Sequence, residues 1–172
     1  LVWLDTISQY PAVTSGGPGF CYDPCCRRLS SQQIAQLDLS SLTLAYVGSE
    51  SIRPQQIQRF CEQFACTGFK PTAFHPCYGL AETVVHACGD WRFEGIKSLT
   101  HRLKSRNQQT ADEIQLTNLG KPFNDHCIHI VDPKTRQVLP ESCIGEVWIK
   151  GPSVAKGYWN NAELNSKIFD QD

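Results

Sequence analysis

Two short stretches of the sequence carry the residue types best suited to binding a nucleotide and a metal ion. The first is the turn Gly48-Ser49-Glu50, and the second is the string HPCYGLAE at positions 75–82. Glycine lets the backbone approach a flat ligand closely, and an aromatic ring such as Tyr78 can stack on a base. Glu82 supplies a carboxylate, a hard oxygen ligand that suits Mg²⁺. These residue types fit a purine nucleotide together with its metal ion.

A Tyr-Gly-x-x-Glu string also has an ordinary structural explanation. Tyr78 can be a packed aromatic side chain, and Glu82 can be a solvated carboxylate that a helix dipole favours in the first turn. A five-residue motif is weak evidence by itself. The elements around the string must therefore decide between a binding site and a plain turn.

The segments around both stretches predict a strand, a helix and a second strand. Residues 42–47 read LTLAYV, an apolar run rich in strand formers that stops at Gly48. A helix is expected from Pro54 to Gly68, because apolar side chains recur there at helical spacing. Residues 72–77 read as a second strand, so the two strands should be parallel with a right-handed crossover. In such sheets ligands bind outside the carboxyl ends of the strands, where both stretches lie.

Longer stretches resemble the acyl-activating, or adenylate-forming, enzyme superfamily. Residues 44–82 resemble its adenylation core, and GEVWIKGPSVAKGYW at 145–159 resembles its later Gly-Glu-to-Gly-Tyr-Trp motif. Within the superfamily the sequence is most similar to fatty-acyl-AMP ligases. The strings that carry this likeness are SGGPGF at 15–20 with Tyr22 and Asp23 after it, PCYGLAE at 76–82 and IVDP at 130–133. The likeness runs from Trp3 to Phe169. It implies an α/β fold, a fragment of the acyl-activating N-terminal domain in which a parallel-sheet α/β part is followed by a β-barrel-like antiparallel part.

The resemblance also implies roles for individual residues. Tyr78 would stack on the adenine, Cys77 would lie near the exocyclic amine edge, and Glu82 would be the catalytic residue that holds the Mg²⁺ bridging the ATP phosphates. Many relatives have threonine where Ala81 stands, whereas alanine is common in the fatty-acyl-AMP branch, so another group would bind the α-phosphate. The full nucleotide-binding set implied is Gly48, Ser49 and Glu50, which line the adenine slot, with Cys77, Tyr78, Gly79, Leu80 and Ala81.

The activity implied by the resemblance is ATP-dependent activation of a fatty acid to an acyl-adenylate, which is then transferred to an acyl carrier protein. ATP and Mg²⁺ would be the cofactors, and catalysis would consist mostly of positioning and of neutralising phosphate charge. Two alternatives stay open, an acyl-CoA ligase of the same fold and a non-catalytic adenylation-like binding module. The acyl chain length is open too, as is the choice between a free-standing ligase and a module of a polyketide or peptide synthase.

The chain is expected to contain parts of two subdomains. Residues 1–118 would belong to the α/β adenylation subdomain, and residues 119–172 to the β-barrel subdomain. Antiparallel strands are expected at 127–131 and 145–151, where apolar and polar residues alternate. Trp159 is expected to be a hydrophobic plug of this barrel.

Residues 89–118 form a polar stretch that resembles the insertion separating fatty-acyl-AMP ligases from acyl-CoA ligases, which would restrict domain motion and transfer to coenzyme A. Ile96, Leu99 and Leu103 share one helical face, and the remaining surface is basic. We expect a short docked helix with a solvated basic face and a mobile tail at 105–112. The alternative is that the basic face binds carrier protein or nucleic acid.

The ends of the chain indicate an internal fragment. The sequence contains no methionine, begins inside an apparent helix at 3–8 and ends in a polar segment. By resemblance, the phosphate loop would precede Leu1, and the ribose-binding aspartate, the hinge and the domain with the adenylating lysine would follow Asp172. The chain by itself is therefore expected to be inactive.

Composition sets limits on partners and on the cellular compartment. The net charge is -1 and no apolar run reaches the length of a membrane span, so neither nucleic acid nor a bilayer is the expected partner. The nine cysteines include no Cys-x-x-Cys pair, which favours free thiols in a cytoplasmic protein. The run His126-Cys127-Ile128-His129 could suggest a metal site, but its alternation is that of a strand with Cys127 and His129 on one face.

Overall fold

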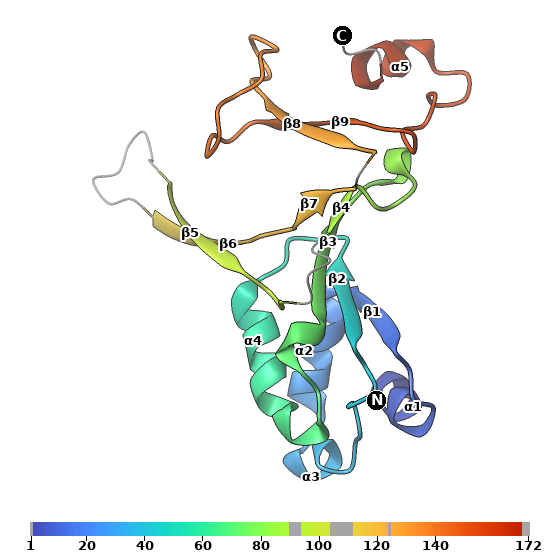
Figure 1. Ribbon diagram of the computed structural model, residues 1–172, viewed down its shortest axis with the longest axis vertical. Helices are drawn as coiled ribbons and strands as arrows, with labels where there is room; N and C mark the ends of the chain where they lie inside the picture. The colour runs from blue at the N-terminus through green and yellow to red at the C-terminus, as the bar shows by residue number, and fades with distance from the viewer. Residues whose placement is uncertain (1, 90–93, 104–111, 124, 170–172) are drawn as a thin grey trace. The chain divides into compact units, whose positions relative to one another are not determined.

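The computed structural model describes residues 2–89, 94–103, 112–123 and 125–169 of the 172-residue chain (Figure 1). Its internal contacts divide the chain into two units. The first unit comprises Leu1–Tyr78 and Gly89–Lys121, and the second comprises Gly79–Cys88 and Pro122–Asp172. The predicted fold class is confirmed, since helices and a sheet with parallel strands come first and an antiparallel pair follows.

Three parallel strands of a five-stranded sheet form the centre of the first unit. Its strand order is β1-β2-β3-β4-β7, with β1 (Thr14–Pro18), β2 (Leu44–Gly48), β3 (Phe74–Tyr78), β4 (Cys88–Gly89) and β7 (Lys121–Pro122). The parallel register pairs Pro18 with Gly48, and Val47 with Pro76. The carboxyl ends of β1, β2 and β3 therefore meet at one edge, as the strand-helix-strand pattern predicts.

Helices precede the first of these strands and connect the next ones. They are α1 (Val2–Gln9), α2 (Gly19–Arg28), α3 (Ser31–Ile34) and α4 (Pro54–Gln63), with 3-10 turns η1 (Ala65–Thr67) and η2 (Pro71–Ala73). The helix predicted from Pro54 begins there, where a missing backbone N–H costs nothing. Its α-helical part stops at Gln63, and η1 follows before Gly68 turns the chain with a φ of 78°.

An aromatic cluster fills the core between the helices and the sheet. α2 and α4 pack against each other, and the Tyr22 and Phe60 rings meet edge to face with their centroids 5.2 Å apart. Phe60 also stacks on Phe64 at 4.2 Å, and both rings are buried. Such pairs contribute about 0.5 to 1.5 kcal/mol beyond the area they bury. The apolar stripe of α4 thus holds this helix on the sheet.

The segment predicted to be a docked helix is instead a pair of strands. β5 (Ser98–Leu103) and β6 (Asp112–Thr117) are antiparallel, with Leu99 opposite Leu116. The Thr117 hydroxyl donates to the Ile52 carbonyl oxygen at 2.9 Å, which ties β6 to the segment before α4. The helical prediction was wrong because spacing alone could not reveal the partner strand β6, of which only Asp112 fell within the predicted tail at 105–112. Residues 105–111 of that tail lie outside the described part of the chain.

The second unit contains the predicted antiparallel pair. β8 (Cys127–Val131) pairs with β9 (Glu146–Lys150), and the unit also holds the 3-10 turn η3 (Ala81–Thr83) and α5 (Ala162–Ile168). Cys127 and His129 are exposed on one face of β8, as the alternation predicts. Among the described residues, no group of three or more His, Cys, Asp or Glu side chains could hold a metal ion.

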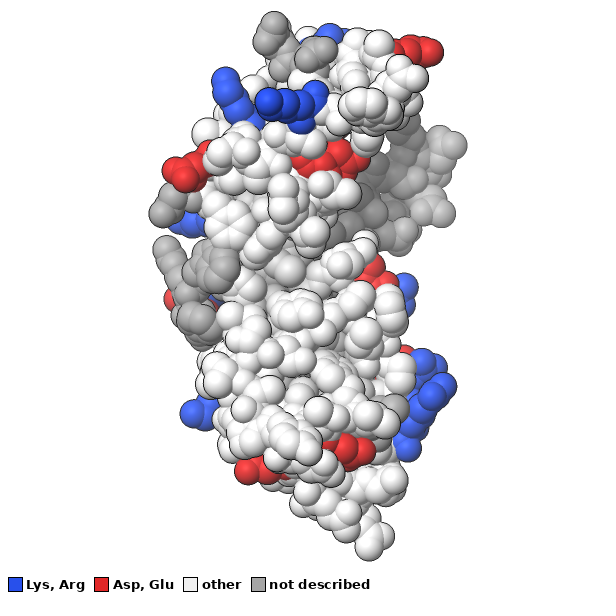
Figure 2. Space-filling model, turned by 90° about the vertical axis from the view of Figure 1, so that its right-hand side faces the viewer, with Lys and Arg blue, Asp and Glu red and all other residues white. Residues whose placement is uncertain are grey.

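Three global properties bear on function. All nine cysteines are free thiols. None of the helices in the described part of the chain is long and apolar enough to cross a membrane. On the face shown in Figure 2, basic and acidic side chains both occur in small groups, and most of the surface is uncharged.

Candidate active site

In the first unit, the ends of β2 and β3 lie in close contact through Gly48 and Cys77. A Cβ atom at Gly48 would lie 2.8 Å from both the carbonyl oxygen and the Sγ of Cys77, so only glycine fits there. The Cys77 thiol donates to the Val47 carbonyl oxygen at 3.5 Å, and burial raises the pKa of this thiol. The structure thus brings Gly48 and Cys77 together as predicted. Tyr78, also half-buried, follows at the end of β3.

The turn after β2 is held by a contact that the sequence did not reveal. Ser49 has a φ of 65°, which is uncommon for a residue with a side chain and is often found at functional sites. Glu50 accepts a hydrogen bond through Oε1 from the backbone N–H of Phe20 at 2.7 Å. Phe20 lies in the first turn of α2, where the helix dipole favours a negative charge. The carboxylate of Glu50 therefore binds the helix, while Ser49 and Glu50 are exposed and Gly48 is buried.

In the second unit, residues 79–85 form a tight turn. The backbone N–H of Val85 donates to the Leu80 carbonyl oxygen at 3.0 Å, and a Cβ at Gly79 would lie 1.8 Å from the Val85 carbonyl oxygen. Val84 and Val85 have φ values of 54° and 75°, which β-branched residues rarely adopt. Glycine at position 79 is thus a requirement of this turn, which carries the predicted site residues Leu80, Ala81 and Glu82.

Glu82 lies in η3 and is held at both its backbone and its side chain. Its carbonyl oxygen accepts from the backbone N–H of Ala155 at 2.7 Å, and its Oε1 accepts a short hydrogen bond from the Tyr158 hydroxyl. This bond lowers the pKa of the Glu82 carboxyl group and raises the pKa of the Tyr158 hydroxyl. The side chain is therefore charged at neutral pH. Its carboxylate oxygens are hard ligands of the kind that Mg²⁺ prefers.

The contact of Tyr158 with Glu82 was not predicted from the sequence, although Tyr158 belongs to the string GYW on which the resemblance rests. A tyrosine hydroxyl can bind a carboxylate, but the spacing of 76 residues between Tyr158 and Glu82 gives no local signal of their contact. The prediction for the next residue was wrong. Trp159 is 98% exposed, so in this structure it is no hydrophobic plug.

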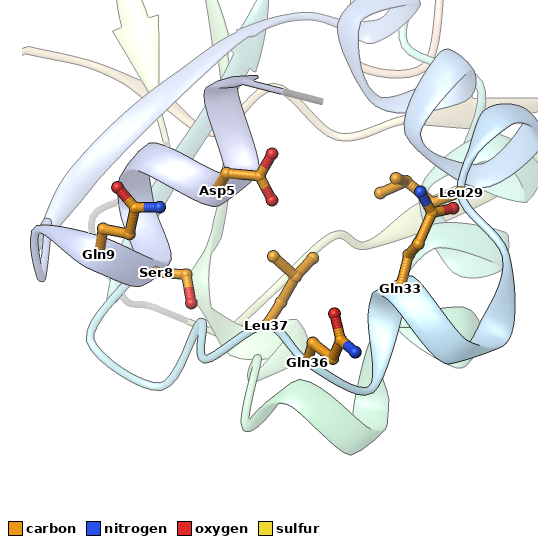
Figure 3. Close-up of a pocket in the computed structure, with 7 residues that line it drawn as sticks. All are labelled: Asp5, Ser8, Gln9, Leu29, Gln33, Gln36 and Leu37. Atoms are coloured by element: carbon orange, nitrogen blue, oxygen red, sulfur yellow. The ribbon is translucent and has the colours of Figure 1, made fainter.

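A separate cavity of about 290 Å³ lies among α1, α3 and the segments beside α3 (Figure 3). It is lined by Asp5, Ser8, Gln9, Leu29, Gln33, Gln36 and Leu37. None of the predicted nucleotide or metal residues lines it. This cavity is therefore distinct from the residues predicted to bind the nucleotide and the metal ion.

Comparisons with known proteins agree with the predicted superfamily. The family model of AMP-binding enzymes matches residues 2–159. The chain is 34% identical to the medium-chain-fatty-acid–[acyl-carrier-protein] ligase JamA of Moorena producens, over 97% of this chain and 30% of that protein. It is 35% identical to the ligase TtuA of Teredinibacter turnerae, which carries the same description, over 95% of this chain and 26% of that protein.

A solved structure gives the same result. The fatty acyl-adenylate ligase from L. pneumophila, in complex with acyl adenylate and pyrophosphate, matches with a TM-score of 0.87 and 34% identity, over 95% of this chain and 30% of that chain. The chain thus spans less than a third of the length of each of these three relatives. Because the family model covers most of the 172 residues, the chain belongs to the AMP-binding enzyme family.

Proposed function

We propose that the protein containing this chain is an ATP-dependent ligase that activates a fatty acid as its acyl-adenylate and transfers the acyl group to an acyl carrier protein. Two relatives are described as ligases that join a medium-chain fatty acid to an acyl carrier protein. A third was solved with acyl adenylate and pyrophosphate. The fatty-acid substrate and the acyl carrier protein are proposed here because these relatives are described as acting on them.

The arrangement of Glu82 is the observation that carries the proposal. The carboxylate is charged, is fixed by Tyr158 and lies within the turn that begins at Gly79. We assign Glu82 as the Mg²⁺ ligand, and a bound Mg²⁺ would neutralise charge on the phosphates of ATP. The backbone of the Gly48-Ser49-Glu50 turn would contact the adenine, and Tyr78 would stack on it. Cys77, Gly79, Leu80 and Ala81 would complete the nucleotide-binding surface.

The proposed reaction has two steps. In the first, a carboxylate oxygen of the fatty acid attacks the α-phosphorus of ATP, and pyrophosphate leaves with the electrons of the broken P–O bond. In the second, the thiol of the carrier protein's phosphopantetheine attacks the acyl carbonyl carbon, AMP leaves and the thiol proton is released. The residues of this chain would serve the first step by positioning the base and by binding the metal ion.

The subdomain assignment and the compartment are part of the same proposal. Residues 1–118 would belong to the α/β adenylation subdomain, with 89–118 as the insertion that limits transfer to coenzyme A, and residues 119–172 to the β-barrel subdomain. Nine free thiols support a reducing compartment such as the cytoplasm.

The experiment that tests the proposal supplies the full-length protein with radiolabelled fatty acid, ATP and Mg²⁺, together with either coenzyme A or phosphopantetheinylated carrier protein. We expect acyl-adenylate in every reaction, acyl-carrier product with the carrier protein and little thioester with coenzyme A. Efficient formation of acyl-CoA would identify an acyl-CoA ligase instead. Absence of adenylate with every chain length tested would identify a non-catalytic binding module.

A further inference from the structure

The turn that carries Glu82 is attached to a pair of side chains from the β8–β9 region of the same unit. The Ser153 hydroxyl donates to the carbonyl oxygen of Thr83, the residue after Glu82, at 3.0 Å. His126 Nε2 lies 2.6 Å from the Ser153 Oγ. The contacts form a chain that runs from His126 through Ser153 to the backbone of the Glu82 turn.

The direction of these hydrogen bonds follows from a count of hydrogens. A serine hydroxyl has one hydrogen, and in Ser153 this hydrogen goes to the Thr83 carbonyl oxygen. The contact between His126 and Ser153 therefore needs a hydrogen on Nε2 of the histidine. The other ring nitrogen, Nδ1, is buried and has no hydrogen-bond partner among the described residues, so it can remain without a hydrogen. His126 is thus the donor that orients the Ser153 hydroxyl.

The backbone near Ser153 is shaped to admit the histidine ring. A Cβ atom at Gly151 would lie 2.3 Å from Cδ2 of His126, so only glycine allows the ring to occupy this place. Gly151 and Ser153 both belong to the string GPS at 151–153, within the motif that carried the resemblance. The residue types at these two positions therefore follow from one geometric requirement, which is to hold His126 and the hydroxyl that it orients.

We propose that His126 and Ser153 are positioning residues that hold the Glu82 carboxylate in the place required for metal binding. The proposal rests on the assignment of Glu82 as the Mg²⁺ ligand. Neither side chain touches the carboxylate. They fix the carbonyl group of Thr83, while Ala155 and Tyr158 fix Glu82 itself. Groups that orient a metal ligand commonly affect metal affinity nearly as strongly as the ligand does.

The test uses the full-length protein and measures Mn²⁺ binding by electron paramagnetic resonance, together with the Mg²⁺ concentration that gives half-maximal adenylation. Ser153→Ala removes one oxygen atom and should weaken Mn²⁺ binding and raise the Mg²⁺ requirement by about tenfold. At saturating Mg²⁺ the rate should recover most of its original value. His126→Ala should have a similar effect, and the double variant should be no worse than either single variant.

Conservative and control variants separate this role from general destabilisation. His126→Gln places an amide N–H near the position of Nε2 and should restore most of the metal affinity. His129→Gln changes an exposed residue of β8 and should leave the metal affinity unchanged. If His126→Ala folds poorly, Ser153→Ala alone decides the question.

Two results would overturn the inference alone, and a third would overturn the assignment of Glu82 and the inference that rests on it. Unchanged Mn²⁺ binding in Ser153→Ala, or additive losses in the double variant, would show that the two residues do not act together on Glu82. Full metal binding in Glu82→Gln would instead remove Glu82 from the metal site, and the proposed role of this carboxylate would fail with it.

Discussion

The side chain of Glu82, the proposed metal ligand, is held by contacts that are distant in sequence. The carboxylate accepts from Tyr158, and the adjoining backbone accepts from Ala155 and Ser153. Mg²⁺ demands near-ideal octahedral geometry, so a ligand that is already oriented loses less freedom when it binds. The charge of Glu82 was evident from the sequence, whereas its orientation was not.

Replacing Glu82 with glutamine tests the metal assignment directly. Glu82→Gln keeps the shape of the side chain and removes its charge, so adenylation by the full-length protein should fall by roughly two to three orders of magnitude. The melting temperature should barely change, because the side chain is not part of the core. Glu141→Gln, an exposed position of the second unit, is the matched control and should keep full activity. A Glu82→Gln protein with most of its activity would make this residue an ordinary solvated carboxylate.

The hydrogen bond from Tyr158 predicts a change in pH dependence. The bond lowers the pKa of the Glu82 carboxyl group. The negative charge proposed to bind the metal ion is therefore present at neutral pH and is lost as the pH falls through this lowered pKa. Tyr158→Phe removes the bond, and the carboxylate should then take up a proton at a higher pH. Mn²⁺ binding followed through the acid range should therefore be lost at a higher pH in Tyr158→Phe than in the original protein. Coincident profiles would show that Tyr158 does not influence the metal ligand.

The helices and strands differ in how far the sequence could predict them. β2, α4 and β3 were predicted because each has a complete local pattern, with an apolar run or stripe that ends at a glycine or proline. β5 was not, because Leu99 and Leu103 fit a helical face as well as a strand face. Only pairing with β6 distinguishes the two, and pairing is a property of two segments. The same reason explains why Gly48 and Tyr78 could be placed at a sheet edge while the contact of Glu50 with α2 could not.

The hydrogen bond of Tyr22 attaches α2 to the sheet, so its loss should lower the stability of the fold. Its hydroxyl donates to the Tyr46 carbonyl oxygen of β2 at 2.9 Å, and burial raises the pKa of this hydroxyl well above its usual value. Tyr22→Phe leaves that carbonyl oxygen without this donor and should destabilise the fold by about 1 to 2 kcal/mol. Thermal unfolding should show a lower melting temperature. Tyr10→Phe is the control, because Tyr10 is 72% exposed and its loss of a hydroxyl should change little. Equal melting temperatures for the two variants would contradict this role of Tyr22.

The burial of individual cysteine thiols predicts the order in which they react with an alkylating reagent. Burial raises the pKa of Cys25 and of Cys61 to about 11, so few of these groups are thiolates near neutral pH. Alkylation of the native protein at mildly alkaline pH should therefore modify Cys66 and Cys127, which are exposed, well before Cys25. Mass spectrometry of peptides taken at successive times measures the order, and unfolded protein should lose it. Modification of Cys25 as fast as Cys66 in the native state would show that the α2 core opens readily.

The separation in sequence between contacting residues determines the order in which these contacts can form during translation. Tyr22 reaches its partner on β2 across 24 residues, and Cys77 reaches β2 across 30. Ser153 and Tyr158 reach the Glu82 turn only across 70 and 76 residues. Translation proceeds from the amino terminus, and closing a longer loop costs more entropy. On the ribosome, the parallel strands can therefore pair before the residues that fix the Glu82 turn have been synthesised, so the nascent chain can form the proposed surface for the base before the proposed ligand for the metal is held in place.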